Sequence, residues 1–287
     1  MLTLCSLSSG SKGNAFFIKT GTDAYLIDVG ISCRQICDRI DEIGHSYRDI
    51  RGVFISHEHS DHIRGLPVLL KKHPVPVYIS RGTLNHTNVE IPDSCLRLVR
   101  NDSRILLDNT DVEVEVLKKS HDACDPSFFN VKYRGLQTSV ITDIGYGCNN
   151  VTESIRQADI LFLESNYDEA MLANGFYPPF LQKRITGREG HISNRTAAHL
   201  IRKFASSKLS HVFLSHLSEN NNTPELAMST FREIVEQRKD LRFRVHLTSI
   251  QGVSEVVEIP VDSSSSEAEL NFNRPILSEI EQHQRAR

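Results

Sequence analysis

Three histidines and an aspartate cluster in the segment FISHEHSDH, residues 54–62. Apolar residues before the cluster predict a short buried strand, and IRGLPVLLKKH after it predicts a helix. His57 and His59 are two residues apart, so an extended chain points them the same way. Asp61 and His62 follow where the chain turns into the helix. Imidazole and carboxylate groups at this spacing are typical ligands of divalent metals. The alternative interpretation is a solvated polar turn, which would not require this spacing.

The segment HEHSDH matches the H-x-H-x-D-H motif, and the chain here resembles the metallo-β-lactamase superfamily. That resemblance implies three further ligands at the ends of later strands, namely His121, Asp143 and His216. His57, His59 and His121 would then hold one metal ion, and Asp61, His62 and His216 a second, with Asp143 bridging. Two divalent ions, Zn or Mn, would share a hydroxide that acts as the nucleophile. Asp61 is thereby implied in catalysis as well as in metal binding.

The order ADILFLESNYD, GHISNRTAAHL and LSHLS resembles the tRNase Z enzymes. In that family a Glu–His pair is thought to protonate the leaving oxygen. The resemblance therefore implies that Glu164 orients His191 and that His191 is the general acid, a role suited to a pKa near neutrality. Two alternatives remain open: His191 satisfies a helix cap or a polar group in the core, and Glu164 is a surface carboxylate at a strand end.

The chain resembles the YycJ (WalJ) family in several segments between about residue 3 and residue 250. The most specific of these segments are GHISN and HLSENNNTPE. Members are described as metal-dependent 5′–3′ exonucleases acting on DNA, so we expect a phosphodiester hydrolase with DNA, or RNA, as its substrate. The same ligands serve small-molecule cyclic phosphodiesterases and thioester or ester hydrolases, and these stay as the alternative. A regulatory protein with a vestigial site is a third hypothesis, and its argument is weakened by the intact ligands.

The elements that must position these residues alternate along the chain. Strand patterns and helical patterns alternate at both ends, around a strand-rich middle that includes VEVEV. Ser32 and Thr223 are predicted N-caps, and Pro224 fits a first helical position. We expect an α+β fold, the metallo-β-lactamase αββα four-layer sandwich, with two mixed sheets and outer helices. Residues 1–260 would form the hydrolase domain, and the Ser-rich acidic segment 261–287 a mobile extension.

The composition is that of an ordinary globular protein, and the net charge is −3. The chain therefore lacks the overall positive charge that many nucleic-acid-binding proteins carry. The six cysteines form no C-x-x-C pair, and no apolar window would span a membrane, so a cytoplasmic protein without a membrane partner is expected. The oligomeric state is left open.

Local features favour an anionic substrate. Residues 180–210 hold one acidic residue, Glu189, and seven basic ones, a net charge of +6 around His191: Lys183, Arg184, Arg188, Arg195, Arg202, Lys203 and Lys208. Phosphate contacts or a solvated helix face both explain this charge. Asn14, in a loop that is either a phosphate cradle or a tight turn, and Asn194 are predicted to bind substrate. We find no interleaving of aromatic and basic residues that would indicate base stacking.

Overall fold

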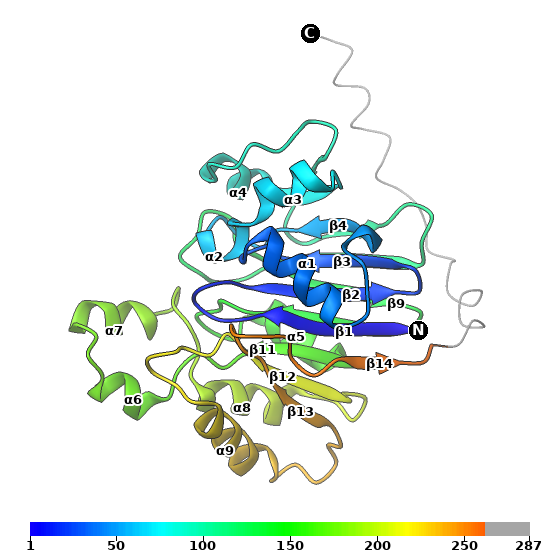
Figure 1. The fold of residues 1–287 in the computed structure, drawn as a ribbon. Helices are drawn as coiled ribbons and strands as arrows, with labels where there is room; N and C mark the ends of the chain where they lie inside the picture. The colour runs from blue at the N-terminus through cyan, green and yellow to red at the C-terminus, as the bar shows by residue number, and fades with distance from the viewer. Residues whose placement is uncertain (262–287) are drawn as a thin grey trace.

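A computed structural model describes residues 1–261 of the 287-residue chain (Figure 1). Its first sheet has the strand order β14-β1-β2-β3-β4-β5-β6. These strands are β1 (Leu2–Ser8), β2 (Ala15–Thr20), β3 (Asp23–Ile27), β4 (Ile50–Phe54), β5 (Val77–Ser80), β6 (Leu96–Val99) and β14 (Val257–Ile259). Strands β3 to β6 run parallel, whereas β14, β1, β2 and β3 pair antiparallel, so the sheet is mixed.

The second sheet has the order β13-β12-β11-β10-β9-β8-β7. Its strands are β7 (Ser103–Leu106), β8 (Val112–Lys118), β9 (Ser127–Tyr133), β10 (Leu136–Ile141), β11 (Ile160–Glu164), β12 (His211–Ser215) and β13 (Arg244–Leu247). Strands β10 to β13 are parallel, and β7 to β10 pair antiparallel, so this sheet is mixed as well.

The helices lie outside the two sheets. They are α1 (Cys33–Glu42), α2 (Ser60–Ile63), α3 (Leu66–Lys72), α4 (Arg81–His86), α5 (Asn149–Gln157), α6 (Glu169–Asn174), α7 (Pro179–Ile185), α8 (Asn194–Phe204) and α9 (Pro224–Val235), with a 3-10 turn at Tyr47–Asp49. One apolar cluster joins α1 and α3 to the first sheet, and another joins α5, α8 and α9 to the second. A third fills the space between the sheets. This is the αββα four-layer sandwich, and the predicted fold class is confirmed.

Sequence-local signals account for the longer helices. Ser32 accepts a hydrogen bond from the backbone N–H of Gln35, whose side chain reaches back to the Ser32 N–H, so α1 begins with a capping box. The Thr223 side chain accepts a hydrogen bond from the backbone N–H of Leu226 at the start of α9, and Pro224 occupies the first turn. Between the layers Phe16 of β2 meets Phe162 of β11 edge to face at 5.2 Å, which joins the inner faces of the two sheets.

Strand direction decides where the polar side chains gather. Strands β3 and β4 of the first sheet are parallel, as are β10, β11 and β12 of the second. In open α/β sheets the carboxyl ends of parallel strands form the usual binding edge. Asp28, His57, Asp143, Glu164 and His216 each follow or close one of these strands. The site therefore lies along one edge of the sandwich.

Several elements were not predicted. The sequence pattern identified neither β1, β6, β14 nor the short helices α4, α6 and α7, and the segment holding α6 and α7 was interpreted as a plain connection. Of the predicted extension 261–287, all but Val261 lies outside the described residues. Within residues 1–261, no helix has the length and apolarity needed to cross a membrane. All six cysteines have free thiols.

Candidate metal centre and active site

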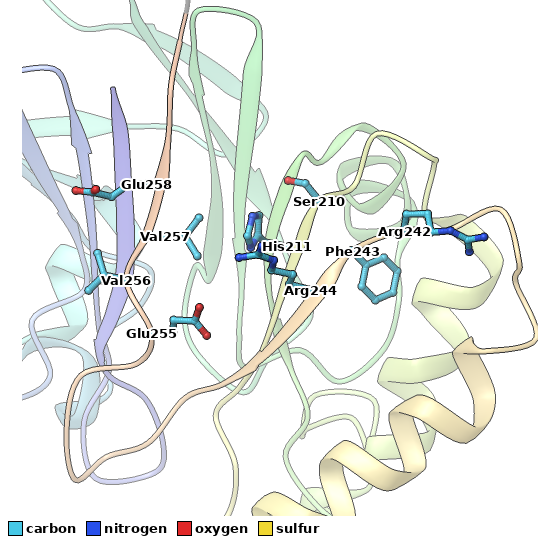
Figure 2. A pocket seen from close by; sticks show the side chains of 9 residues that line it. All are labelled: Ser210, His211, Arg242, Phe243, Arg244, Glu255, Val256, Val257 and Glu258. Carbon is cyan, nitrogen blue, oxygen red and sulfur yellow. The ribbon is translucent and has the colours of Figure 1, made fainter.

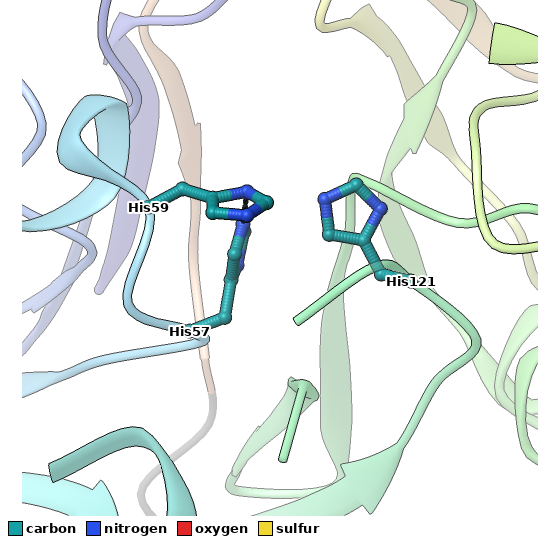
Figure 3. A group of neighbouring side chains, drawn as sticks. All are labelled: His57, His59 and His121. Atoms are coloured by element: carbon teal, nitrogen blue, oxygen red, sulfur yellow. Dashed lines mark hydrogen bonds between the residues drawn. The ribbon is translucent and has the colours of Figure 1, made fainter. Parts of the chain in front are cut away.

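Three predicted ligands, His57, His59 and His121, converge from two different sheets. His57 follows β4, His59 is the N-cap of α2, and His121 follows β8 (Figure 3). One ring nitrogen from each lies within 4.8 Å of the others. His57 Nε2 is 3.1 Å from His59 Nδ1, so these two nitrogens point at each other. Three imidazoles whose ring nitrogens lie this close together form a group that could hold a divalent cation.

Asp143 lies between this group and the remaining ligands. Its Oδ2 is 3.3 Å from His62 Nε2, and its Oδ1 is 3.2 Å from His216 Nδ1. His62 Nε2 is in turn 3.4 Å from Asp61 Oδ2, and the rings of His62 and His216 stand 6.4 Å apart. The structure thus brings all seven predicted ligands to one place, with Asp143 in the middle.

Unsatisfied atoms show that this place fits a divalent cation. Asp143 Oδ2 and His216 Nε2 are buried, and neither forms a hydrogen bond within the described part of the chain. Burial opposes the charge on Asp143, but the His216 and His62 rings outweigh it and hold the pKa of its carboxyl well below the ordinary value. A buried carboxylate oxygen and a buried imidazole nitrogen without partners are donors of the kind that Zn²⁺ or Mn²⁺ sites use.

Glu164 and His191 form the pair that was predicted. The Glu164 side chain is fully buried at the end of β11, and its Oε1 lies 2.7 Å from His191 Nδ1 and 3.0 Å from His216 Nδ1. Its Oε2 accepts hydrogen bonds from the backbone N–H groups of Ile144 and Ile192. Glu164 is therefore no surface carboxylate, since it fixes two imidazoles at once and leaves both Nε2 atoms directed elsewhere.

The charges of this pair support each other. Burial lowers the pKa of His191, but the Glu164 carboxylate more than offsets this and raises it to about 8. Burial likewise opposes ionisation of Glu164, and His191 outweighs it and brings the pKa of Glu164 to about 2. The His191 side chain is 22% exposed, and its Nε2 forms no hydrogen bond in residues 1–261. His191 can therefore be charged near neutrality and reached from outside.

Comparison with known proteins shows which family this chain belongs to. The model of the metallo-beta-lactamase superfamily matches residues 9–125. The chain is 34% identical over 236 residues to exodeoxyribonuclease YycJ of Bacillus anthracis, covering 81% of this chain and 88% of that protein. It is 30% identical over 260 residues to exodeoxyribonuclease WalJ of Streptococcus pneumoniae, covering 88% and 96%.

The chain belongs to the YycJ/WalJ family of the metallo-beta-lactamase superfamily. It is a metal-dependent hydrolase, as predicted. Among solved structures, the metallo-beta-lactamase fold protein YhfI from Bacillus subtilis superposes with a TM-score of 0.68 at 13% identity, covering 90% of this chain and all of that one. That likeness concerns the fold alone.

Asp28 is a site residue that sequence reasoning missed. It directly follows β3 in the segment LIDVG, is 1% exposed, and lies 2.7 Å from His62 Nδ1 through Oδ2. It also accepts hydrogen bonds from Ser56 N and Ser56 Oγ. Asp28 therefore fixes the His62 ring with Nε2 facing the metal ligands. The available signal was an aspartate closing a buried strand, which is the same signal that marked Asp143.

Backbone strain marks the same positions. Asp28, Asp143 and His216 have φ angles of 62°, 55° and 55°, in the left-handed region that residues with a Cβ seldom adopt. Such strain costs about 1–3 kcal/mol at each position and concentrates at functional sites. All three residues follow a strand at this edge, so the turns there aim the side chains inward.

We expect Asp28→Asn to weaken metal binding about 10-fold to 100-fold, because His62 loses the charged partner that holds its tautomer. Competition with a chromophoric chelator measures this affinity. Asp23→Asn is the matched control, since Asp23 begins the same strand and pairs with Arg51 at 3.1 Å. Equal affinity in Asp28→Asn and the wild type would contradict the assigned role.

The geometry does not favour Asn14 and Asn194 as substrate ligands. Asn14 is fully buried, and its amide lies against Asp61 Oδ2 and His62 Nε2 at 3.4 and 3.2 Å. Asn194 is 2% exposed and exchanges hydrogen bonds with Asn222 and Ser165. Both amides are committed to neighbours inside the protein, so Asn14 supports the metal ligands and Asn194 supports the fold.

The basic residues near His191 are fewer than predicted. Arg202 and Lys203 occupy the last turn of α8, about 15 Å along the helix from its His191 end, and Lys208 lies beyond them. Arg184 is 2.5 Å from Asp122, and Arg195 is 3.6 Å from Glu169. The net charge of +6 is thus not gathered around His191, because part of it lies at the far end of α8 and part is paired with acidic side chains.

Two cavities lie at different distances from the metal ligands. One of about 750 Å³ includes His121, Lys119 and Tyr146 in its lining, so it opens beside the metal ligands. Another of about 610 Å³ is lined by His211 and Arg244, the first residues of β12 and β13, and by Glu255 (Figure 2). Because His216 follows the other end of β12, this second cavity is remote from the candidate chemistry.

Proposed function

We propose that this hydrolase is an exodeoxyribonuclease that degrades DNA from the 5′ end with two divalent metal ions, Zn or Mn. The observation that carries the proposal is the His191–Glu164 pair beside the seven grouped ligands, since a phosphodiester hydrolase needs both an electrophilic centre and a proton donor. The names of the relatives, which are exodeoxyribonucleases, support DNA as the substrate.

His57, His59 and His121 would hold one ion, and Asp61, His62 and His216 the other, with Asp143 contributing to both. When bound, two such ions lower the pKa of a water molecule and withdraw charge from phosphate oxygens. Asp28 and Glu164 accept hydrogen bonds at Nδ1 of His62 and His216, which directs the Nε2 atom of each ring toward the other ligands. These carboxylates preorganise the ligands before any cation arrives.

His191 would supply the proton of the cleavage step. Its Nδ1 is engaged by Glu164, so the proton on Nε2 is the one available to the leaving oxygen of the cleaved phosphodiester. The buried Glu164 carboxylate stabilises the charged imidazole before transfer and prevents the ring from turning. Exposure of the ring edge allows the proton to be replaced from water after each turnover.

The test is digestion of 5′-labelled and 3′-labelled DNA by protein first stripped with a chelator and then supplied with Mn²⁺ or Zn²⁺. We expect no digestion without metal, restored digestion with metal, and release of labelled mononucleotide first from the 5′-labelled strand. Metal analysis of protein purified without added metal identifies the native ion. Failure to digest any DNA with either ion, while bis-p-nitrophenyl phosphate is hydrolysed, would overturn the proposal in favour of a small phosphodiester substrate.

A further inference from the structure

Three exposed aromatic side chains lie at the active-site end of the molecule. Phe176 is fully exposed and Phe180 is 74% exposed, on the hairpin formed by α6 and α7, and Tyr146 is 37% exposed. In residues 1–261 no other Phe or Tyr side chain is exposed. Figure 1 shows α6 and α7 standing out from the sandwich at the left, on the side where α2 carries Asp61 and His62. Exposed apolar groups gathered in one place indicate an interaction site.

The hairpin is held in position without help from these phenylalanines. Helix α7 has no buried residue, so packing does not explain why it forms. Asp168 caps α6, and Asn220 donates a hydrogen bond to the Tyr177 hydroxyl at 2.9 Å. His191 N donates to Ile185 O at the end of α7 at 2.8 Å. The hairpin is therefore tied to the two loops that carry His191 and His216.

The charge of this hairpin favours a polyanion. From Gly175 to Arg188 there is no acidic residue. Arg184 is balanced by Asp122, but Lys183 and Arg188 form no ion pair in the described part of the chain. The Arg188 guanidinium instead stacks over the Tyr146 ring at 4.5 Å. Aromatic and basic residues are therefore interleaved here, contrary to the expectation from sequence.

A continuous surface joins the hairpin to the metal ligands. A cavity of about 510 Å³ has Lys183, Arg188 and Tyr146 in its lining, and it shares Tyr146 with the cavity that contains His121. Phe180 lies five residues before Ile185, about 7.5 Å along the helix axis. Phe180 thus stands on the helix whose end is bonded to the His191 loop, beside a cavity lined by Lys183 and Arg188 as well as by Asp122 and Glu189.

We propose that the α6–α7 hairpin is a stacking platform for unpaired nucleobases, on which Phe176 and Phe180 hold single-stranded DNA as it enters the active site. Base–aromatic stacking tolerates any sequence, whereas lysine and arginine follow the backbone, as non-specific single-strand binding requires. This inference rests on the proposed nuclease function and assigns it a single-stranded substrate segment. A second copy of the chain is the competing occupant of the apolar surface.

The experiment measures binding of a fluorescent oligothymidylate to the full chain in chelator, so that no cleavage occurs. We expect the double variant Phe176→Ala/Phe180→Ala to bind about 10-fold to 100-fold more weakly than the wild type. An oligonucleotide of abasic residues should bind the wild type as weakly as the double variant binds oligothymidylate. The variant itself should no longer distinguish the two oligonucleotides.

Further variants separate stacking from other roles. Phe176→Trp/Phe180→Trp should retain binding, whereas leucine at both positions keeps apolar area but should lose it. Leu106→Ala, at an exposed apolar residue of β7, should bind as the wild type does. Equal binding by the alanine variant, or retained binding by the leucine variant, would overturn the inference, as would a change from dimer to monomer by light scattering. If the wild type digests DNA yet the alanine variant binds normally, only this inference fails; if the wild type neither binds nor digests DNA, the proposed function fails with it.

Discussion

His191→Ala is expected to keep the metal content of the wild type and to lose about 10²-fold to 10⁴-fold in kcat. The ring is held by Glu164 at 2.7 Å through Nδ1, and Nε2 is the only nitrogen left to deliver a proton. Removing the ring takes away the proton donor but leaves the seven ligands intact. Steady-state digestion of DNA, paired with metal analysis of the same preparation, measures both quantities.

His199→Ala is the matched control, because His199 is an exposed histidine on α8, eight residues further along the chain. It should leave kcat unchanged. Since Asp143, Glu164, His191 and His216 are close enough to share one cation, loss of metal from His191→Ala would show that His191 is a ligand and that the acid must be sought elsewhere.

Asp143→Asn is expected to empty the metal centre and abolish hydrolysis. Asp143 is 2% exposed, and its carboxylate lies within 4.0 Å of ring nitrogens of His62, His121, His191 and His216. An amide of the same shape removes the negative charge that a cation between these rings requires. Thermal unfolding measures the loss: metal at 100 times its Kd stabilises the wild type by about 2.7 kcal/mol, and the variant should show no such gain.

Asp49→Asn serves as the control for this variant. Asp49 pairs with Lys19 at 2.6 Å and precedes β4, whereas His57 follows the other end of that strand, so its loss should leave the response to metal intact. If Asp143→Asn still binds two ions and is still stabilised by metal, the prediction that Asp143 is a central metal ligand is wrong.

The sequence by itself determined the elements whose signals are local. The caps of α1 and α9 were predicted because Ser, Thr and Pro act within one helical turn, and strand segments were predicted from short apolar runs. Four of the seven ligands could be identified because they lie in one segment, from His57 to His62. The remaining ligands came from the order of strand-end residues in a family resemblance.

Only the tertiary structure decided which neighbours each of these residues has. Asp28 becomes a partner of His62, and Asn14 is turned inward, because strands distant in the sequence end at one edge. Helix α7 has no buried face, so its sequence shows no apolar pattern from which it could be predicted. Phe176 and Phe180 have side chains typical of the core, but the fold leaves both exposed. Sequence patterns report local propensity and burial on average, whereas the packing of the two sheets fixes which side chains meet and which are left outside.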